Sequence, residues 1–146
     1  MRVISLYGAH TENVYSLDAE DQLVGVSRSS KYPIRAALNP IFSQRDGAEK
    51  FLAARPDLVL VRPMIDRAYP GLIQQLEKYG ITVVSLQPVT IDEMYRYWMV
   101  LGRLLGQERQ AADMVAIFSQ QMKTIATATK PLTPKKRVYF EAIHKK

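Results

Sequence analysis

The sequence predicts an α/β protein: a parallel four-stranded sheet flanked by helices, followed by a long connecting helix and the first strand of a missing second lobe. Three observations support this class. Short apolar segments rich in β-branched residues alternate with segments of helical periodicity over residues 1–89, as in βαβ units. A capping box at Thr90 then opens a much longer helical pattern. An isolated strand-like segment, Arg137–Glu141, follows near the last residue.

The first predicted unit is a strand, a tight loop and a helix. Val3–Leu6 is a short apolar run rich in β-branched residues, and Gly8 permits a sharp turn after it. A helix is predicted over Thr11–Ala19, where Thr11 can cap the first turn and Glu12 suits the positive end of the helix dipole. A strand that passes through a glycine turn into a helix N-terminus forms a ligand-binding mouth in open α/β sheets.

A loop and a helix separate the second and third predicted strands. Val24–Ser27 is a strand, residues 28–41 form a long loop, and a helix covers Gln44–Ala54. This helix ends before Pro56, because the residue that precedes a proline disfavours the helical conformation. The strand Asp57–Val61 is apolar on both faces, which is typical of a parallel sheet covered on both sides.

One more helix and strand complete the predicted N-terminal lobe. Asp66–Tyr79 carries apolar residues at helical spacing, and Gly80 ends this helix. Ile81–Leu86 is the fourth strand. Since strands and helices alternate at short spacing, right-handed crossovers and a parallel sheet are expected, and residues 1–89 form the ligand-binding lobe.

A long helix is predicted to connect this lobe to the next. Thr90 and Glu93 form a capping box, and apolar residues then recur at helical spacing to about Thr127. An unbroken helix of this length would be roughly 55 Å long, which is more than a four-stranded lobe can cover. A bend is therefore expected at Gly102 or Gly106, since glycine costs roughly 1 kcal/mol relative to alanine inside a helix.

The last part of the chain is predicted to be a linker and a strand. Prolines at 131 and 134 mark the linker, and the strand after it has no following helix or hairpin partner. The simplest explanation is that the chain is a fragment. Residues 90–130 would then cross to a second lobe, and residues 131–146 would contain only the first strand of that lobe. A missing lobe would expose apolar surface through which copies of the fragment could associate.

The composition excludes several classes of protein. The chain has 146 residues, the size of one ordinary domain, and no cysteine, which excludes disulfides, cysteine-ligated zinc and thiol nucleophiles. No apolar run approaches the roughly 20 residues that a membrane helix needs, and no signal peptide is visible. The protein is therefore cytosolic, or Met1 follows the removal of a leader. The net charge of +6 favours anionic partners or solubility, but no basic run interleaved with aromatic residues points to nucleic acid.

The sequence contains no catalytic constellation. There is no Gly-x-Gly-x-x-Gly, Walker A, His-Glu-x-x-His or Gly-x-Ser-x-Gly motif, and the two histidines, His10 and His144, lie at opposite ends of the chain. Neither an enzyme nor a metal site is therefore predicted. Two alternatives to a binding protein remain open. One is a cytosolic metal-handling or chelatase-like protein that uses His10, and the other is a basic scaffold that binds a partner.

Candidate ligand-binding residues lie in the loops after the predicted strands, because the carboxyl ends of parallel strands face the ligand. Tyr7 is expected to stack on a ligand or to pack beside the cleft. Arg28 and Arg62 would pair with ligand carboxylates or phosphates, or with surface acids. His10 would bind the ligand or have a structural role. The full set of candidates is Tyr7, Gly8, His10, Arg28, Ser29, Tyr32, Arg62, Met64, Ile65 and Gln87.

The neutral candidates have simpler expected roles. Ser29, Ser30 and Tyr32 would donate hydrogen bonds to the ligand. Met64 and Ile65 would form an apolar floor.

Several of these segments together resemble a known family. They occur in the family's order and at its spacing, and they span nearly the whole chain: Thr11-Glu12, Val24-Gly25-Val26-Ser27, Pro56-Asp57-Leu58-Val59-Leu60, Gly80-Ile81-Thr82-Val83-Val84, Leu101-Gly102-Arg103-Leu104-Leu105-Gly106 and Arg137-Val138-Tyr139-Phe140-Glu141. In these segments the chain resembles the substrate-binding proteins of ABC importers for iron-siderophores, haem and vitamin B12, which are two-lobed periplasmic binding proteins.

The resemblance implies the solute-binding component of an ABC importer. Such a protein captures a metal chelate (ferric siderophore, haem or cobalamin) in the cleft between its lobes and delivers it to a permease. The chelate is cargo, with no covalent cofactor, and the protein is periplasmic or anchored to the outside of a membrane. In this family an exposed glutamate on each lobe docks onto permease arginines. Glu12 matches the first-lobe position, although its charge also suits the helix dipole.

Overall fold

Five parallel strands form one sheet in the order β3-β2-β1-β4-β5. The computed structural model describes residues 1–131, 134 and 136–139. The chain divides into two units, Met1–Val115 and Ala116–Lys146, and the sheet belongs to the first. The parallel α/β class is confirmed, but the predicted number of strands, four, is wrong. The strands are β1 (Val3–Ser5), β2 (Leu23–Ser27), β3 (Ile41–Phe42), β4 (Leu58–Val61) and β5 (Thr82–Ser85).

The additional strand is β3, at the end of the predicted long loop. It pairs with the last residues of β2 and is only two residues long, too short to show strand periodicity in the sequence. The close packing of this pair depends on Gly25. A Cβ atom at Gly25 would lie 2.4 Å from the buried ring of Phe42, so only glycine leaves room for that ring beside β2.

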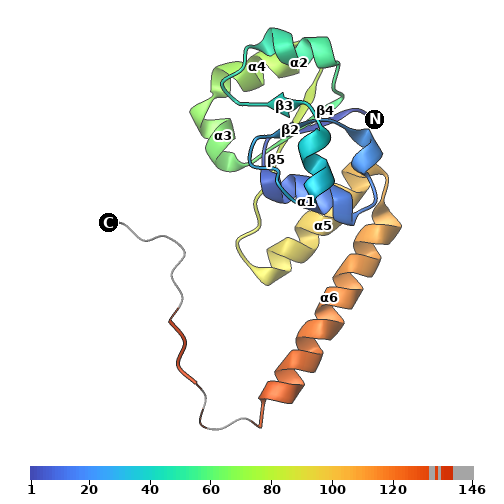
Figure 1. Ribbon diagram of the computed structural model, residues 1–146, viewed down its shortest axis with the longest axis vertical. Helices are drawn as coiled ribbons and strands as arrows, with labels where there is room; N and C mark the ends of the chain where they lie inside the picture. The colour runs from blue at the N-terminus through green and yellow to red at the C-terminus, as the bar shows by residue number, and fades with distance from the viewer. Residues whose placement is uncertain (132–133, 135, 140–146) are drawn as a thin grey trace. The chain divides into compact units, whose positions relative to one another are not determined.

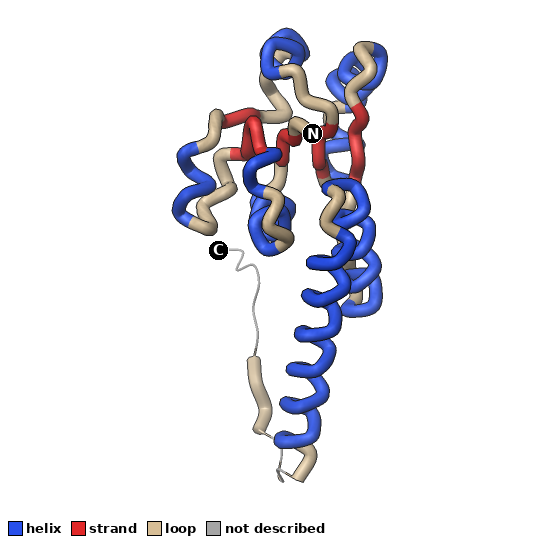
Figure 2. Tube along the Cα trace, turned by 90° about the vertical axis from the view of Figure 1, so that its right-hand side faces the viewer, coloured by secondary structure: helices blue, strands red, loops and turns tan. Residues whose placement is uncertain are grey.

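Helices cover both faces of the sheet (Figure 1). Figure 2 shows the strands between two layers of helix. On one face Ile4, Val59 and Val61 pack in a cluster with Phe51 and Leu76 from the helices above. Every residue of β1 and β4 is buried. The helices on this face are α2 (Ala48–Ala54), α3 (Pro63–Ala68) and α4 (Pro70–Lys78); on the other are α1 (Gly8–Ser16) and α5 (Ile91–Leu105).

Helix α1 begins three residues earlier than predicted. Its N-cap is Tyr7, and the predicted cap, Thr11, lies inside the helix with a buried side chain. The hydroxyl of Thr11 does not cap the helix, because it hydrogen bonds to serine hydroxyls of the neighbouring strand and loop. Short 3-10 helices, η1 (Glu20–Gln22) and η2 (Ile34–Leu38), lie before and after β2.

Two further predicted helices have different bounds. α2 begins at Ala48 rather than at Gln44. The predicted helix Asp66–Tyr79 is two helices, α3 and α4, which break at Tyr69. Pro70 explains the break, since proline has no backbone N–H to continue the first helix but suits the first position of the second.

The predicted capping box is confirmed, whereas the single long helix predicted over residues 90–130 is two helices, separated at Gly106, one of the two glycines where a bend was expected. Thr90 Oγ1 accepts from the Glu93 N–H at 3.2 Å, and the Glu93 carboxylate accepts from the Thr90 N–H at 3.3 Å. α5 ends at Leu105, and Gly106 has the positive φ of 69° that favours glycine at a helix end. The next helix, α6, covers Glu108–Thr129.

The predicted last strand, Arg137–Glu141, falls partly outside the described residues. Residues 136–139 have no regular secondary structure, and residues 140 and 141 lie outside the described part. The inter-lobe role of residues 90–130 stays a prediction. Within the described residues, no helix is long and apolar enough to cross a membrane.

Candidate functional site

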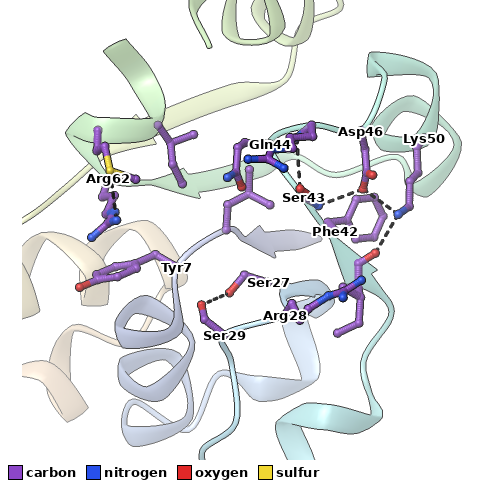
Figure 3. A pocket seen from close by; sticks show the side chains of 15 residues that line it. Tyr7, Ser27, Arg28, Ser29, Phe42, Ser43, Gln44, Asp46, Lys50 and Arg62 are labelled. Carbon is purple, nitrogen blue, oxygen red and sulfur yellow. Dashed lines mark hydrogen bonds and ion pairs between the residues drawn. The ribbon is translucent and has the colours of Figure 1, made fainter. Parts of the chain in front are cut away.

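A pocket of about 820 Å³ lies at the carboxyl ends of β1, β2, β3 and β4 (Figure 3). The strand order reverses between β1 and β4, and the crevice at such a reversal is where open α/β sheets bind ligands. Tyr7 follows β1 and Arg62 follows β4, so the two side chains flank this crevice. The candidates that line the pocket are Tyr7, Arg28, Ser29, Arg62, Met64 and Ile65.

Arg62 and Tyr7 form a stacked pair at the β1–β4 crevice. The guanidinium carbon of Arg62 lies 4.9 Å from the centre of the Tyr7 ring, within cation–π distance. An Arg62 N–H also points to the sulfur of Met64 at 3.2 Å. In the described part of the chain, no acidic side chain forms an ion pair with Arg62 or Arg28. Both guanidinium groups are therefore able to pair with an acceptor on a ligand.

His10 packs against the Tyr7 ring, with the two ring centres 5.2 Å apart, and does not line the pocket. Its side chain is 1% exposed, and both ring nitrogens have partners. Nε2 lies 3.0 Å from the Val61 carbonyl, which only accepts, so Nε2 carries the proton. Nδ1 therefore accepts from the Tyr97 hydroxyl, at 2.8 Å. Burial lowers the pKa of His10 and raises the pKa of Tyr97 well above its usual range, which keeps this arrangement neutral.

These contacts favour the structural role of His10. The ring joins α1 to the end of β4 and to α5, because its partners come from those two elements. Both ring nitrogens are occupied, so neither presents a lone pair to a metal or ligand. Among the described residues there is also no cluster of three or more His, Cys, Asp or Glu side chains that could hold a metal ion.

The remaining candidates lie in other places. A Cβ atom at Gly8 would lie 2.9 Å from the Ser29 carbonyl oxygen, so Gly8 brings the loops after β1 and β2 together without lining the pocket. Tyr32 is 68% exposed and lies outside the pocket lining. Gln87 lines a smaller hollow of about 210 Å³ beside α5. Glu12 is exposed on α1.

A chain of five hydroxyl groups leads from the core to the pocket. Thr11 Oγ1 lies 2.8 Å from Ser5 Oγ and 2.8 Å from Ser30 Oγ. Ser27 Oγ continues the chain, 3.0 Å from Ser30 Oγ and 2.8 Å from Ser29 Oγ. Ser5, Thr11, Ser27 and Ser30 are buried, whereas Ser29 is exposed in the pocket. The network holds the loop after β2 against α1, because its members come from both.

The pocket is positively charged. Four basic side chains, Arg28, Arg45, Lys50 and Arg62, line it together with one acid, Asp46. The Asp46 carboxylate accepts from Lys50 Nζ at 2.7 Å, and this hydrogen bond lowers the pKa of Asp46. One basic charge is therefore neutralised within the wall, and the three arginines give a net positive lining that suits an anionic or polar ligand.

The chain matches known proteins over nearly its whole length. A family model described as "Periplasmic binding protein" matches residues 3–145. The chain belongs to the periplasmic binding protein family. An uncharacterized ABC transporter substrate-binding lipoprotein, YvrC, of Bacillus subtilis is 28% identical over 96% of this chain and 46% of its own length. The vitamin B12-binding protein of Vibrio cholerae is 35% identical over 86% of this chain and 46% of its own length.

Solved structures support the same family. The periplasmic heme-binding protein of Pseudomonas aeruginosa superposes with a TM-score of 0.77 and 29% identity, over 88% of this chain and 48% of that protein. This periplasmic binding protein chain spans about half the length of the curated relatives it matches. The resemblance expected from the sequence is therefore confirmed at the level of the family.

Part of this binding-protein pocket was missed in the sequence. Ser43, Gln44, Arg45, Asp46 and Lys50 line the wall after β3, and none was a candidate. Their position depends on β3, which the sequence did not reveal. The available signal was the spacing of Asp46 and Lys50, four residues apart in a predicted helix, where an ion pair is expected.

Proposed function

We propose that this chain is the N-terminal lobe of the solute-binding component of an ABC importer, and that its pocket holds one side of a metal chelate. The observation that carries the proposal is the positively charged pocket at the β1–β4 crevice, lined by Leu6, Met64 and Ile65 and by arginines that form no ion pair within the described residues. A metal chelate with a large organic ligand offers polar groups to the arginines and apolar surface to this floor. The relatives named as ABC transporter substrate-binding, vitamin B12-binding and heme-binding proteins support it.

The proposed mechanism is capture and delivery without catalysis. Arg28 and Arg62 donate hydrogen bonds to the chelate, and Tyr7, which stacks with Arg62, offers its ring to the apolar surface of the chelate. The chelate, whether cobalamin, haem or a ferric siderophore, is bound as cargo with no covalent bond. The protein works in the periplasm or anchored to the outside of a membrane, in keeping with relatives that are named as lipoprotein and periplasmic proteins.

Glu12 is proposed to contact the permease. It is exposed on α1, and no ion pair in the described residues involves it. It also lies outside the pocket lining, so its carboxylate is able to meet a permease arginine while the pocket is occupied. Delivery of the chelate and its capture would thus use different side chains.

The test is isothermal titration calorimetry of the purified protein with cyanocobalamin, haemin and a ferric siderophore. Saturable binding of one chelate is expected, and Arg62→Ala should weaken it about tenfold or more, since hydrogen bonds from a charged donor contribute roughly 1.5–3 kcal/mol. Arg67→Ala is the matched control, because Arg67 is exposed on α3, the helix that Arg62 caps, and does not line the pocket. Failure of all three chelates to bind, or equal losses in both variants, would contradict the proposal.

A further inference from the structure

The hydroxyl chain that ends at Ser29 has a fixed direction. Ser5 Oγ lies 3.1 Å from the Tyr7 carbonyl oxygen, and a carbonyl only accepts, so the Ser5 proton lies between them. Thr11 Oγ1 lies 2.8 Å from Ser5 Oγ, whose proton is already used, and 3.4 Å from the Tyr7 carbonyl oxygen, which only accepts, so Thr11 donates toward these two oxygens. Each hydroxyl has a single proton, and each donation therefore decides the next.

Each hydroxyl between Thr11 and the pocket donates to the one before it. Ser30 must donate to Thr11, and Ser27 must then donate to Ser30. Ser29 must donate to Ser27, at 2.8 Å (Figure 3). The Ser29 hydroxyl is exposed in the pocket, but its proton points inward. Only its lone pairs remain for a ligand, so Ser29 is an acceptor rather than the donor that the sequence predicted.

We propose that Ser29 selects a chelate whose rim carries primary amides, a refinement that rests on the proposed function. An amide N–H donates to Ser29 Oγ, while the amide oxygen accepts from Arg28, the preceding residue in the sequence, which also lines the pocket. A carboxylate has only lone pairs, and at Ser29 it would face another acceptor. Among the three proposed chelates, cobalamin carries primary amides on its macrocycle and haem carries carboxylates. The geometry therefore favours cobalamin.

The experiment compares cyanocobalamin with its separated monocarboxylic acids, in each of which one side-chain amide is hydrolysed. Calorimetry with the wild-type protein should show tight binding of the amide form. At least one acid isomer should bind about tenfold or more weakly, the loss expected when a hydrogen bond is replaced by two facing acceptors. An increase in affinity for every acid would show that the arginines dominate, and would overturn the proposal.

Thr11→Val is the decisive variant, because Thr11 is buried and does not line the pocket. Valine has the same shape as threonine but no hydroxyl, so it interrupts the chain of hydroxyl groups. The hydrogen bonds of Ser27 and Ser29 can then reverse, and Ser29 can donate to the ligand. The penalty on the acid isomer should then fall to about threefold or less. Ser16→Ala is the control, since Ser16 has an exposed hydroxyl on α1 that does not belong to the chain of hydroxyl groups. This variant should leave the weaker binding of the acid isomer unchanged.

Circular dichroism of each variant shows whether the variant folds. If Thr11→Val does not fold, Ser29→Ala replaces it, because Ser29 is exposed; it should also abolish the difference between amide and acid. An unchanged penalty in a folded Thr11→Val or Ser29→Ala protein would overturn the role of Ser29. Binding of haemin or a ferric siderophore without cobalamin would overturn the amide selection while leaving the proposed function intact. Binding of no chelate would overturn both.

Discussion

Acidification should destabilise the fold through His10. The ring is buried between the Val61 carbonyl and the Tyr97 hydroxyl, and burial lowers its pKa below the ordinary value of 6.5. Below that value the unfolded chain binds a proton that the folded chain does not, so stability is present above about pH 6.5 and is lost as pH falls. With His10 neutral in the folded state, the loss from about pH 7 to about pH 5.5 is at most about 1.3 kcal/mol.

Urea unfolding at several pH values measures this loss. His10→Gln is the comparison, because a glutamine amide has a donor and an acceptor but does not titrate in this range. The wild-type free energy of unfolding should fall with acidification by about 1 kcal/mol more than that of His10→Gln. Equal pH dependence of the wild type and His10→Gln would refute the buried neutral imidazole.

Three other predictions concern packing, hydrogen bonding and docking. Gly25→Ala should lower the free energy of unfolding by about 1–3 kcal/mol in urea, because the new Cβ atom would overlap the Phe42 ring; unchanged stability would contradict that contact. Tyr97→Phe should cost about 1–3 kcal/mol in the same assay, since it leaves buried Nδ1 without a donor; a neutral effect would contradict the bond. Glu12→Gln should reduce uptake by the intact transporter while calorimetry shows unchanged chelate binding; full uptake would remove the docking role.

Strands with strong apolar patterns were predictable. β4 is a run of four buried aliphatic residues, and β1 and β2 combine β-branched residues with short length. β3 could not be found in this way, because pairing with β2, rather than its own two residues, makes it a strand. The break before Pro70 had a sequence signal, since a proline inside a predicted helix interrupts it.

The candidate site was predictable where it depends on strand ends. Tyr7, Arg28 and Arg62 directly follow or lie close after predicted strands, and all three line the pocket. The wall after β3 was missed together with β3. The direction of the hydroxyl chain was also beyond the sequence, because it depends on which hydroxyl groups lie next to the Tyr7 carbonyl. Residue types show that Ser29 has a hydroxyl, but only distances show where its proton goes.

The location of the bound chelate decides whether the carboxyl ends of the strands form the binding site. Backbone amide NMR spectra of the isotope-labelled protein would be recorded with cyanocobalamin and, separately, with diamagnetic gallium analogues of haemin and a ferric siderophore. We predict that one of these ligands shifts the amide signals of Tyr7, Ser29 and Arg62, at the carboxyl ends of the strands. Asp57 and Gly80 line a hollow at the amino ends of β4 and β5, on the other side of the sheet from the pocket's strand ends, and their amide signals should not shift. Shifts confined to Asp57 and Gly80, or none with any ligand, would contradict the account.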